Sequence, residues 1–444
     1  MNKIFLLTCC CRIIIMPVFS QPRLTAEKNT VLLPVAPKGW YSGDIHVHRN
    51  CGDGSIFISE DSLSKMMVVN NLDVISLLAD MGNGEVHDSK VDLLKVSGKD
   101  ALQSRPGRIV HWDAEWHWDA TYSVFEHQAL GGHLVLLGLQ QAKQIWEESP
   151  YKILDWAKQQ HAISGFAHLQ YLADTIQSQL NCCIPIDLPV EAALGTIDFV
   201  SEDVYSNVTP KGGYSSEAAI HAYYKLLNCG FRLGLAAGTD FPCNDKEPLG
   251  NLLTYVKVDG KLNYYKWIAG IKKGNTVISR NGNKEFLDFT VNGKFLPGNN
   301  IPVSSKKKLT AKIVWLSTKS TRGTIELIRN GKIIASKSGT SYPGRPLVLL
   351  TAFSAMERGW IAARRMDSSE HISHSAPIYI TKPGGPVPVS KADVLYFLQW
   401  VNNILNKIEP GGAWHKYFTN DFETVKARYL KAKEIYTKLL TESE

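Results

Sequence analysis

The sequence has few of the features that would assign a function class directly. Its 444 residues include only eight cysteines, too few and too scattered for the disulfide framework of a small secreted domain. The net charge is only +7, and the basic residues are dispersed apart from "SSKKK" at 304–308. Nucleic-acid recognition needs a clustered basic stripe, so we expect no nucleic-acid partner.

Familiar nucleophile and phosphate motifs are also missing. No "GxSxG" elbow follows a predicted strand, as a Ser-His-Asp hydrolase would require. The serines of "GYSSEAA" (213–219) suit a helix N-cap better than a nucleophile. Because the sequence also lacks a P-loop and a basic pair that could clamp phosphate, the expected substrate shifts slightly from phosphoesters toward esters, amides or carbamates.

Beyond the first twenty residues, no apolar run approaches the length of a membrane span. The opening "MNKIFLLTCCCRIIIMPVFSQP" has one lysine, an apolar stretch and the small residue Ser20. This pattern predicts a signal peptide over residues 1–20 and a secreted or periplasmic protein. A lipoprotein cleavage box at Cys9 and an uncleaved cytosolic N-terminus, favoured by Arg12 within the apolar stretch, are the alternatives.

Cleavage after residue 20 would leave an odd number of cysteines in the chain. They allow one disulfide bridge, although the sequence does not identify the pair. The remaining residues are Cys51, Cys182, Cys183, Cys229 and Cys243.

The sequence pattern divides the rest of the chain into three parts. Residues 39–283 alternate about seven apolar runs with amphipathic stretches, which predicts an α/β fold with parallel strands, as a barrel or an open sheet. Residues 285–381 show strand-like alternation and an Asn330-Gly331 hairpin turn, typical of a small antiparallel β domain. After the linker "TKPGGPVPVS", residues 391–444 have helical spacing, and their apolar stripe is expected to dock on another domain.

Two histidines in "DIHVH" stand two residues apart, His46 and His48. On a strand they share one face, just before a polar turn that contains glycine. Paired neutral imidazoles suit Zn²⁺, Fe²⁺ or Mn²⁺. An isolated pair of this kind is more often two ordinary histidines near a turn. A metal site is therefore predicted only if other parts of the chain supply further candidate ligands.

The stretch "HWDAEWHWD" (111–119) supplies such residues in clean alternation. Its tryptophans share one face of a strand, and the other face carries His111, Asp113, Glu115, His117 and Asp119. Charged groups on a buried face must be paired, solvated or bound to metal. The alternative is an exposed polar face opposite a core lined by tryptophan.

Three further candidates flank other predicted strands: His133, His168 and Asp240. His48, Glu115, His168 and Asp240 each fall at or near the end of a different strand. In barrels, ligands from several strands converge at that end. His133 does not fit this arrangement because it precedes its apolar run. Each of these residues alone is better explained as structural, but together they favour metal coordination.

In this order, "GDIHVHRNCGDG", the Glu115 strand, "GGHLVLLGL", "GFAHLQ" and "GTD" resemble the PHP-type metallohydrolases. Among these the chain most resembles the carbaryl-hydrolase-like CehA/McbA branch. The likeness covers about residues 39–283 and extends more weakly to "SHSAPIYI" (373–380). It implies a distorted (β/α)7 PHP-type barrel with metals at the carboxyl ends of its strands, followed by the small antiparallel β domain and the C-terminal helical segment.

The resemblance also implies a ligand set. One metal would be held by four residues, His46, His48, Glu115 and Asp240. Glu115 would bridge to a second metal held by His133 and His168, and Asp53 matches an acidic position that helps to hold a third. Zinc is the expected ion, with manganese or iron as alternatives, at one or two per chain. Glu115, Asp240 and His168 would be the residues closest to the chemistry.

The chain departs from this family pattern at two positions. Met81 stands after Asp80 where a histidine is usual, and Pro242 stands where another histidine is usual. A thioether is a poor ligand for a hard divalent ion, and proline offers no donor atom. A third metal is therefore not expected, and Asp53 and Asp80 would instead orient histidines by hydrogen bonds.

These observations predict a metal-dependent hydrolase that activates water against an ester, amide or carbamate bond of a small-molecule substrate. A PHP-type phosphoesterase and a non-catalytic binding module on a degenerate barrel are the alternatives. The candidates for the acid that protonates the leaving group are a nearby carboxylate, His111, His117 and His161. Glu202 and Asn207 are candidate pocket residues. The sequence does not indicate an oligomeric state.

Overall fold

The computed structural model describes most of the chain from residue 35 onward. The described residues are 35–51, 56–82, 89–117, 132–145, 149–167, 185–202, 216–243, 248–302, 308–354, 358–368, 370–381, 389–418 and 420–442. The predicted signal segment 1–20, and the candidate residues Asp53, His168 and Asn207, lie outside them.

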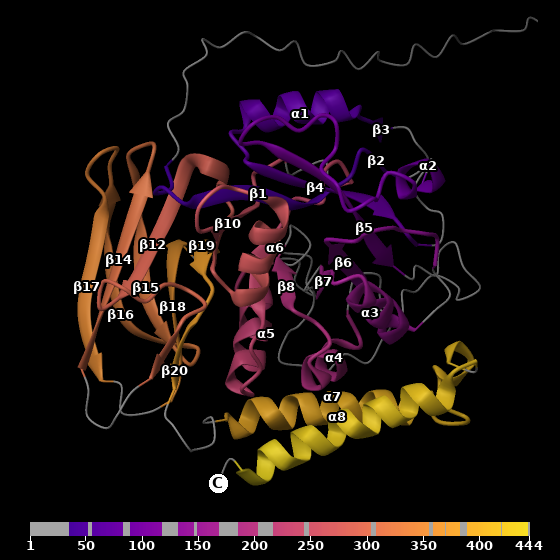
Figure 1. The fold of residues 1–444 in the computed structure, drawn as a ribbon. Coiled ribbons are helices and arrows are strands. Elements are labelled where there is room, and N and C mark those ends of the chain that lie inside the picture. Colours follow the sequence, from indigo (N-terminus) through magenta and orange to yellow (C-terminus); the bar gives the residue numbers. More distant parts are fainter. Residues whose placement is uncertain are drawn as a thin grey trace, which may run out of the picture. The chain divides into compact units, whose positions relative to one another are not determined.

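Strands and helices alternate through the first part of the described chain (Figure 1), which confirms the predicted α/β class. In chain order the elements are β1 (Trp40–Val47), β2 (Asn50–Cys51), β3 (Ile56–Phe57), α1 (Glu60–Val69), β4 (Val74–Asp80), α2 (Ser89–Leu93), β5 (Ile109–His117), β6 (His133–Leu137), α3 (Pro150–Gln159), β7 (Ile163–Phe166), α4 (Leu188–Leu194), β8 (Phe199–Glu202), α5 (Ser216–Asn228), β9 (Gly234–Ala237), β10 (Leu253–Lys257), α6 (Tyr264–Lys273) and β11 (Thr276–Ser279).

Strand direction differs from the all-parallel expectation at β6. Neighbouring strands follow the order β1-β4-β5-β6-β7-β8-β9, and most of these pairs are parallel. However, β6 runs antiparallel to both β5 and β7. A buried apolar run carries no information on direction, because an antiparallel neighbour can follow without a crossover helix. On its other edge, β1 pairs antiparallel with β10, which pairs antiparallel with β11.

The end of β1 and the segment after β9 meet, although 195 residues separate the bonded groups of Asp44 and Thr239. Val47 and Phe241 form an isolated parallel bridge, and the His48 amide donates to the Phe241 carbonyl oxygen at 2.6 Å. We call residues 44–51 and 238–243 together the β1–β9 junction. The junction places the last strand of the series beside the first.

Apolar side chains fill both faces of this sheet. Trp112, Ala114 and Trp116 are buried in one apolar cluster, so the predicted tryptophan face of β5 is confirmed. A second cluster joins inward-facing residues of the strands to α6. There Trp267 is fully buried, and a side chain on Gly43 would approach its ring within 2.5 Å. A glycine is therefore required on β1 where α6 crosses it.

The trailing strands divide between two sheets. β12 (Glu285–Val291), β14 (Lys308–Ser317) and β17 (Leu347–Ser354) form a separate antiparallel sheet. The others extend the large mixed sheet, because β19 pairs with β11. These are β13 (Asn300–Pro302), β15 (Thr321–Arg329), β16 (Lys332–Ser341), β18 (Gly359–Asp367), β19 (Glu370–Ser375) and β20 (Ile378–Thr381).

The predicted hairpin is confirmed between β15 and β16. Its turn residues Asn330 and Gly331 have φ of 47° and 81°, as a two-residue turn of this type requires. By contrast, β14 does not pair with β15, although the two follow one another in the sequence. It pairs with β12 and β17 instead.

Two long helices close the described chain, as the spacing predicts: α7 (Lys391–Ile408) and α8 (Phe422–Glu442). They contact one another along their length (Figure 1). Ser390 caps α7 through the Asp393 amide. Across the part of the chain that is described, no helix has both the length and the apolarity to cross a membrane.

The apolar stripe of α8 docks on α4 and carries a buried polar contact. Tyr429 donates its hydroxyl hydrogen to Asp187, and Arg428 lies 2.6 Å from the Glu191 carboxylate. Burial and the nearby Glu191 carboxylate together raise the pKa of Asp187 from 3.8 to about 7, against the opposing effects of Tyr429 and Arg428.

This contact predicts a pH dependence of stability. Because the folded state binds the Asp187 proton more tightly than the unfolded state, the free energy of unfolding should fall as pH rises from about 4 to about 7. Asp187→Asn should remove that part of the fall, measured by urea unfolding at about pH 5 and about pH 8. Asp61→Asn, at an exposed site on α1, should keep it. An unchanged pH profile in Asp187→Asn would contradict the assignment.

Candidate metal centre

Four of the predicted ligands meet at one buried point. His46 lies on β1, His48 follows the strand, and Glu115 lies near the end of β5. Asp240 follows β9. All four side chains are buried, and one donor atom from each lies within 4.8 Å of the others. We call His46, His48, Glu115 and Asp240 the four-residue cluster.

The donor atoms are spaced as the corners of a small coordination shell. Glu115 Oε2 lies 3.2 Å from His46 Nε2 and 2.9 Å from His48 Nε2. Asp240 Oδ1 lies 3.4 and 3.5 Å from the same two nitrogens. Ligands of a tetrahedral ion with bonds of about 2.1 Å are separated by about 3.4 Å. The cluster therefore has the dimensions that a divalent ion needs.

The protonation state of His48 also fits metal binding. Its Nδ1 lies 3.2 Å from the carbonyl oxygen of Leu78, which can only accept a hydrogen bond. Nδ1 therefore donates to this carbonyl, and Nε2 faces the cluster. Metal-bound histidines are oriented in this way by a backbone carbonyl.

The charge of the cluster gives a second reason for a cation. Burial alone would raise the pKa of Glu115, but His46 and His133 outweigh it and hold that pKa well below its usual range. Glu115 is 4% exposed and Asp240 6%, so two carboxylates share a site with little water. The positive partner that such buried carboxylates need is either a protonated histidine or a bound cation. Two nitrogens and two carboxylate oxygens are a donor set for Zn²⁺, Fe²⁺ or Mn²⁺.

His133 lies beside the cluster despite its position at the start of an apolar run. Its Nδ1 is 3.0 Å from Glu115 Oε1, the carboxylate oxygen that does not face His46 and His48. The antiparallel direction of β6 explains this, because the start of β6 lies opposite the end of β5, where His117 pairs with His133. His168, the other predicted ligand of a second metal, lies outside the described residues.

Asp44 supports the cluster, and the sequence analysis did not assign it a role. Its Oδ1 accepts the amide hydrogens of His46 at 3.2 Å and Thr239 at 3.0 Å. Its Oδ2 accepts the Thr239 hydroxyl at 2.5 Å and the Gly250 amide at 3.1 Å. Burial raises the pKa of Asp44 to about 6, although these hydrogen bonds oppose the shift. An acidic residue two positions before His46, within a buried strand, was the available signal.

Met81 and Asp80 lie outside the four-residue cluster. Met81 is fully buried in an apolar cluster, and its amide donates to the Glu115 carbonyl oxygen at 2.8 Å. Asp80 accepts the Gly82 amide at 2.6 Å. Among the described residues, the side chains that can hold a metal are those of the four-residue cluster. Asp53 lies outside them.

Most other candidates have structural contacts. His111 stacks on Tyr264 with ring centres 3.8 Å apart and lies 2.9 Å from Asp100. Tyr264 also donates to Asp113. His161 is exposed in the turn after α3, and the side chain of His117 is not described.

Glu202, the predicted pocket residue at the end of β8, contacts the trailing strands. Its Oε2 lies 3.1 Å from Arg280 Nη1, and its Oε1 lies 2.8 Å from His371 Nε2. His371 belongs to β19. Arg280 and His371 lower the pKa of Glu202 against the effect of burial. The residue therefore stabilises the continuation of the large sheet.

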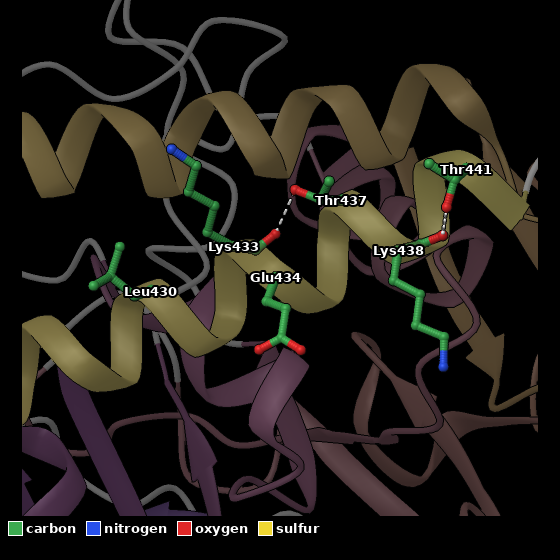
Figure 2. Close-up of a pocket in the computed structure, with 6 residues that line it drawn as sticks. All are labelled: Leu430, Lys433, Glu434, Thr437, Lys438 and Thr441. Carbon is green, nitrogen blue, oxygen red and sulfur yellow. Dashed lines mark hydrogen bonds between the residues drawn. The ribbon is translucent and has the colours of Figure 1, made fainter.

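A surface depression on α8 is unrelated to this chemistry (Figure 2). Its cavity volume is about 470 Å³. It is lined by Leu430, Lys433, Glu434, Thr437, Lys438 and Thr441. All six belong to one helix, and the hydroxyls of Thr437 and Thr441 donate to carbonyls of the same helix. None of the candidate metal ligands lies among these residues.

Removal of the Asp44 carboxylate should destabilise the fold. In Asp44→Ala, the buried amides of His46, Thr239 and Gly250 lose their acceptor, at about 1–3 kcal/mol each. We expect the free energy of unfolding to fall by about 3 kcal/mol or more, measured by urea denaturation. Asp259→Ala, at an exposed site, should change it by less than about 0.5 kcal/mol. A loss below about 1 kcal/mol for Asp44→Ala would contradict this role.

Comparisons with known proteins leave the family of this chain open. No family model matches the chain, and no curated protein matches it. Among solved structures, CHIR-AB1 aligns at 13% identity over 22% of this chain and 96% of its own, with a TM-score of 0.16. The CARDB domain of PF1109 from Pyrococcus furiosus aligns at 11% identity over the same shares, also with a TM-score of 0.16. Likenesses at this level carry no argument about function.

Proposed function

We propose that this protein is a metal-dependent hydrolase that acts on an ester, amide or carbamate bond of a small-molecule substrate. The observation that carries the proposal is the buried four-residue cluster, in which donor atoms from three separate strand ends lie within 4.8 Å of one another. Fold maintenance does not require two imidazoles and two carboxylates at one buried point. Such an arrangement costs stability unless a cation is bound.

The cluster residues have distinct roles in this proposal. His46 and His48 supply neutral nitrogens, and Glu115 and Asp240 supply the negative charge that balances a divalent ion. When bound, such an ion supplies Lewis acidity, which activates water near neutral pH and polarises a carbonyl or phosphoryl oxygen. His133, 3.0 Å from the second oxygen of Glu115, either orients that carboxylate or, with His168, holds a second ion.

Strand order supports a PHP-type barrel as the scaffold. Seven strands run in the order β1-β4-β5-β6-β7-β8-β9, and the bridge between Val47 and Phe241 brings the series back toward its start. The cluster residues on β5 and after β9 lie at the carboxyl ends of their strands, as barrel active sites do. The resemblance to the CehA/McbA branch rests on the ordered motifs, together with this strand order and the cluster.

Two further proposals concern the metal and the compartment. Zinc fits the donor set best, with manganese or iron as alternatives, at one or two ions per chain. A disulfide joins Cys51 and Cys243, and disulfides persist mainly in exported proteins. This bond supports secretion or export to the periplasm.

Metal content tests the assignment of ligands. Protein purified with zinc should hold one to two ions per chain by elemental analysis. The double variant His46→Ala with His48→Ala should hold almost none, because two of the four donors are gone. His161→Asn replaces an exposed histidine outside the cluster and should keep the full content. Full metal content in the double variant would disprove the site.

A substrate panel tests the reaction. We expect metal-replete protein to hydrolyse aryl esters, carbamates or anilides, and a chelator to abolish turnover until zinc is restored. Glu115→Gln should reduce kcat/KM at least about a hundredfold, since it removes a charge from the ion's surroundings. Turnover of phosphate esters alone would instead indicate a phosphoesterase. Metal uptake without turnover of any substrate class would indicate a binding module.

A further inference from the structure

Three contacts hold the two halves of the β1–β9 junction together, and they bracket the ligands. Upstream, the Asp44 carboxylate binds the amide and hydroxyl of Thr239. In the middle, the His48 amide donates to the Phe241 carbonyl oxygen. Downstream, Cys51 is bonded to Cys243, with Cα atoms 5.2 Å apart and a sequence separation of 192 residues.

The spacing of the disulfide matches the spacing of the ligands. Cys51 follows His48 by three residues, and Cys243 follows Asp240 by three residues. The bond therefore joins the two chain segments that carry three of the four donors, on the side where both segments leave the sheet. Cys51 belongs to β2, which pairs with β3, and Cys243 lies beyond the strand bridge at Phe241. The disulfide therefore links the β2–β3 pair to the segment after β9.

Asp240 has an unfavourable backbone conformation, which a restraint on the neighbouring residues stabilises. Asp240 has φ of 53°, in the left-handed region that costs a residue with a side chain about 1 kcal/mol. A residue keeps such a conformation only where its surroundings fix it on both sides. Asp44 fixes the residue before it, through Thr239, and the His48–Phe241 hydrogen bond and the disulfide together restrain the residues after it.

We propose that the Cys51–Cys243 disulfide is a positioning element of the metal centre, which holds Asp240 opposite His46 and His48 and so sets the metal affinity. This inference depends on metal binding by the four-residue cluster, which the proposed function also requires, but not on the bond that is hydrolysed. Cys51 and Cys243 do not bind the ion themselves. Their bond reduces the freedom of the donors before the ion arrives.

Metal affinity and fold stability separate this role from a purely structural one. A bond across 192 residues stabilises any fold by restricting the unfolded chain, so a lower melting temperature alone is not informative. A positioning bond must also change the zinc dissociation constant of the folded protein. Contacts that orient metal ligands typically contribute about 10- to 100-fold in metal affinity.

The test compares full-length wild type with the double variant Cys51→Ser with Cys243→Ser. Zinc affinity is measured by competition with a chromogenic chelator, at a temperature where both proteins are folded. We expect the variant to bind zinc at least about tenfold more weakly. The control is Ile313→Ala, which opens a cavity in the separate β12-β14-β17 sheet. It should lower the melting temperature of the metal-free protein but leave zinc affinity unchanged.

Each outcome decides a different question. Equal zinc affinity in wild type and the double-serine variant, within about twofold, would overturn the positioning role. A tenfold loss that Ile313→Ala shares would also overturn it, because general destabilisation would then explain the effect. If oxidised wild type bound no zinc at all, the metal centre of the proposed function would fail, and with it the basis of this inference. A loss confined to the double-serine variant would establish it.

Discussion

The candidate centre depends on the contact between the end of β1 and the segment after β9. Those segments are far apart in sequence, and three of the four donors lie on them. Buried hydrogen bonds from Thr239 to Asp44 and from His48 to Phe241 hold them together. Each of these bonds replaces a contact with water that burial has removed, so that breaking one leaves a buried polar group without a partner.

Electrostatics make the same region costly without a cation. Glu115 and Asp240 are acidic groups in a nearly dry site, and their imidazole neighbours are neutral in their metal-binding form. A protein can tolerate this arrangement by protonating histidines or by binding an ion. His48 directs Nδ1 at a backbone carbonyl and Nε2 at Glu115, an orientation that suits both a protonated histidine and a metal ligand.

Most of the trailing strands continue the large mixed sheet, while β12, β14 and β17 form a sheet of their own. β19 pairs with β11, and Arg280 and His371 meet Glu202 where this extension contacts β8. β8 pairs with β9, and Asp240 follows β9. Contacts between the trailing strands and β8 therefore stabilise the strands that lead to Asp240. A pattern of alternating apolar residues predicts strands of this kind. It does not predict which strands pair, because that depends on which edge of the large sheet is still unpaired.

The sequence alone predicted many of the elements and the residues that could hold a metal. Period-two alternation in 111–117 separated the tryptophan face from the polar face, and the spacing of His46 and His48 put two imidazoles on one side of a strand. The Asn330-Gly331 turn likewise determined a hairpin, because few residues adopt positive φ. These signals are local, and local physics suffices to read them.

Only the tertiary structure decided which residues distant in the sequence contact one another. It turned β6 antiparallel and so carried His133 to Glu115, made Asp44 a hydrogen-bond acceptor for distant amides, and paired Cys51 with Cys243. It also placed Glu202 in contact with Arg280 and with His371 of the trailing strands. Each outcome depends on strand direction or on contact between remote segments. A linear pattern of residues does not encode these, because many chain paths bury the same apolar faces.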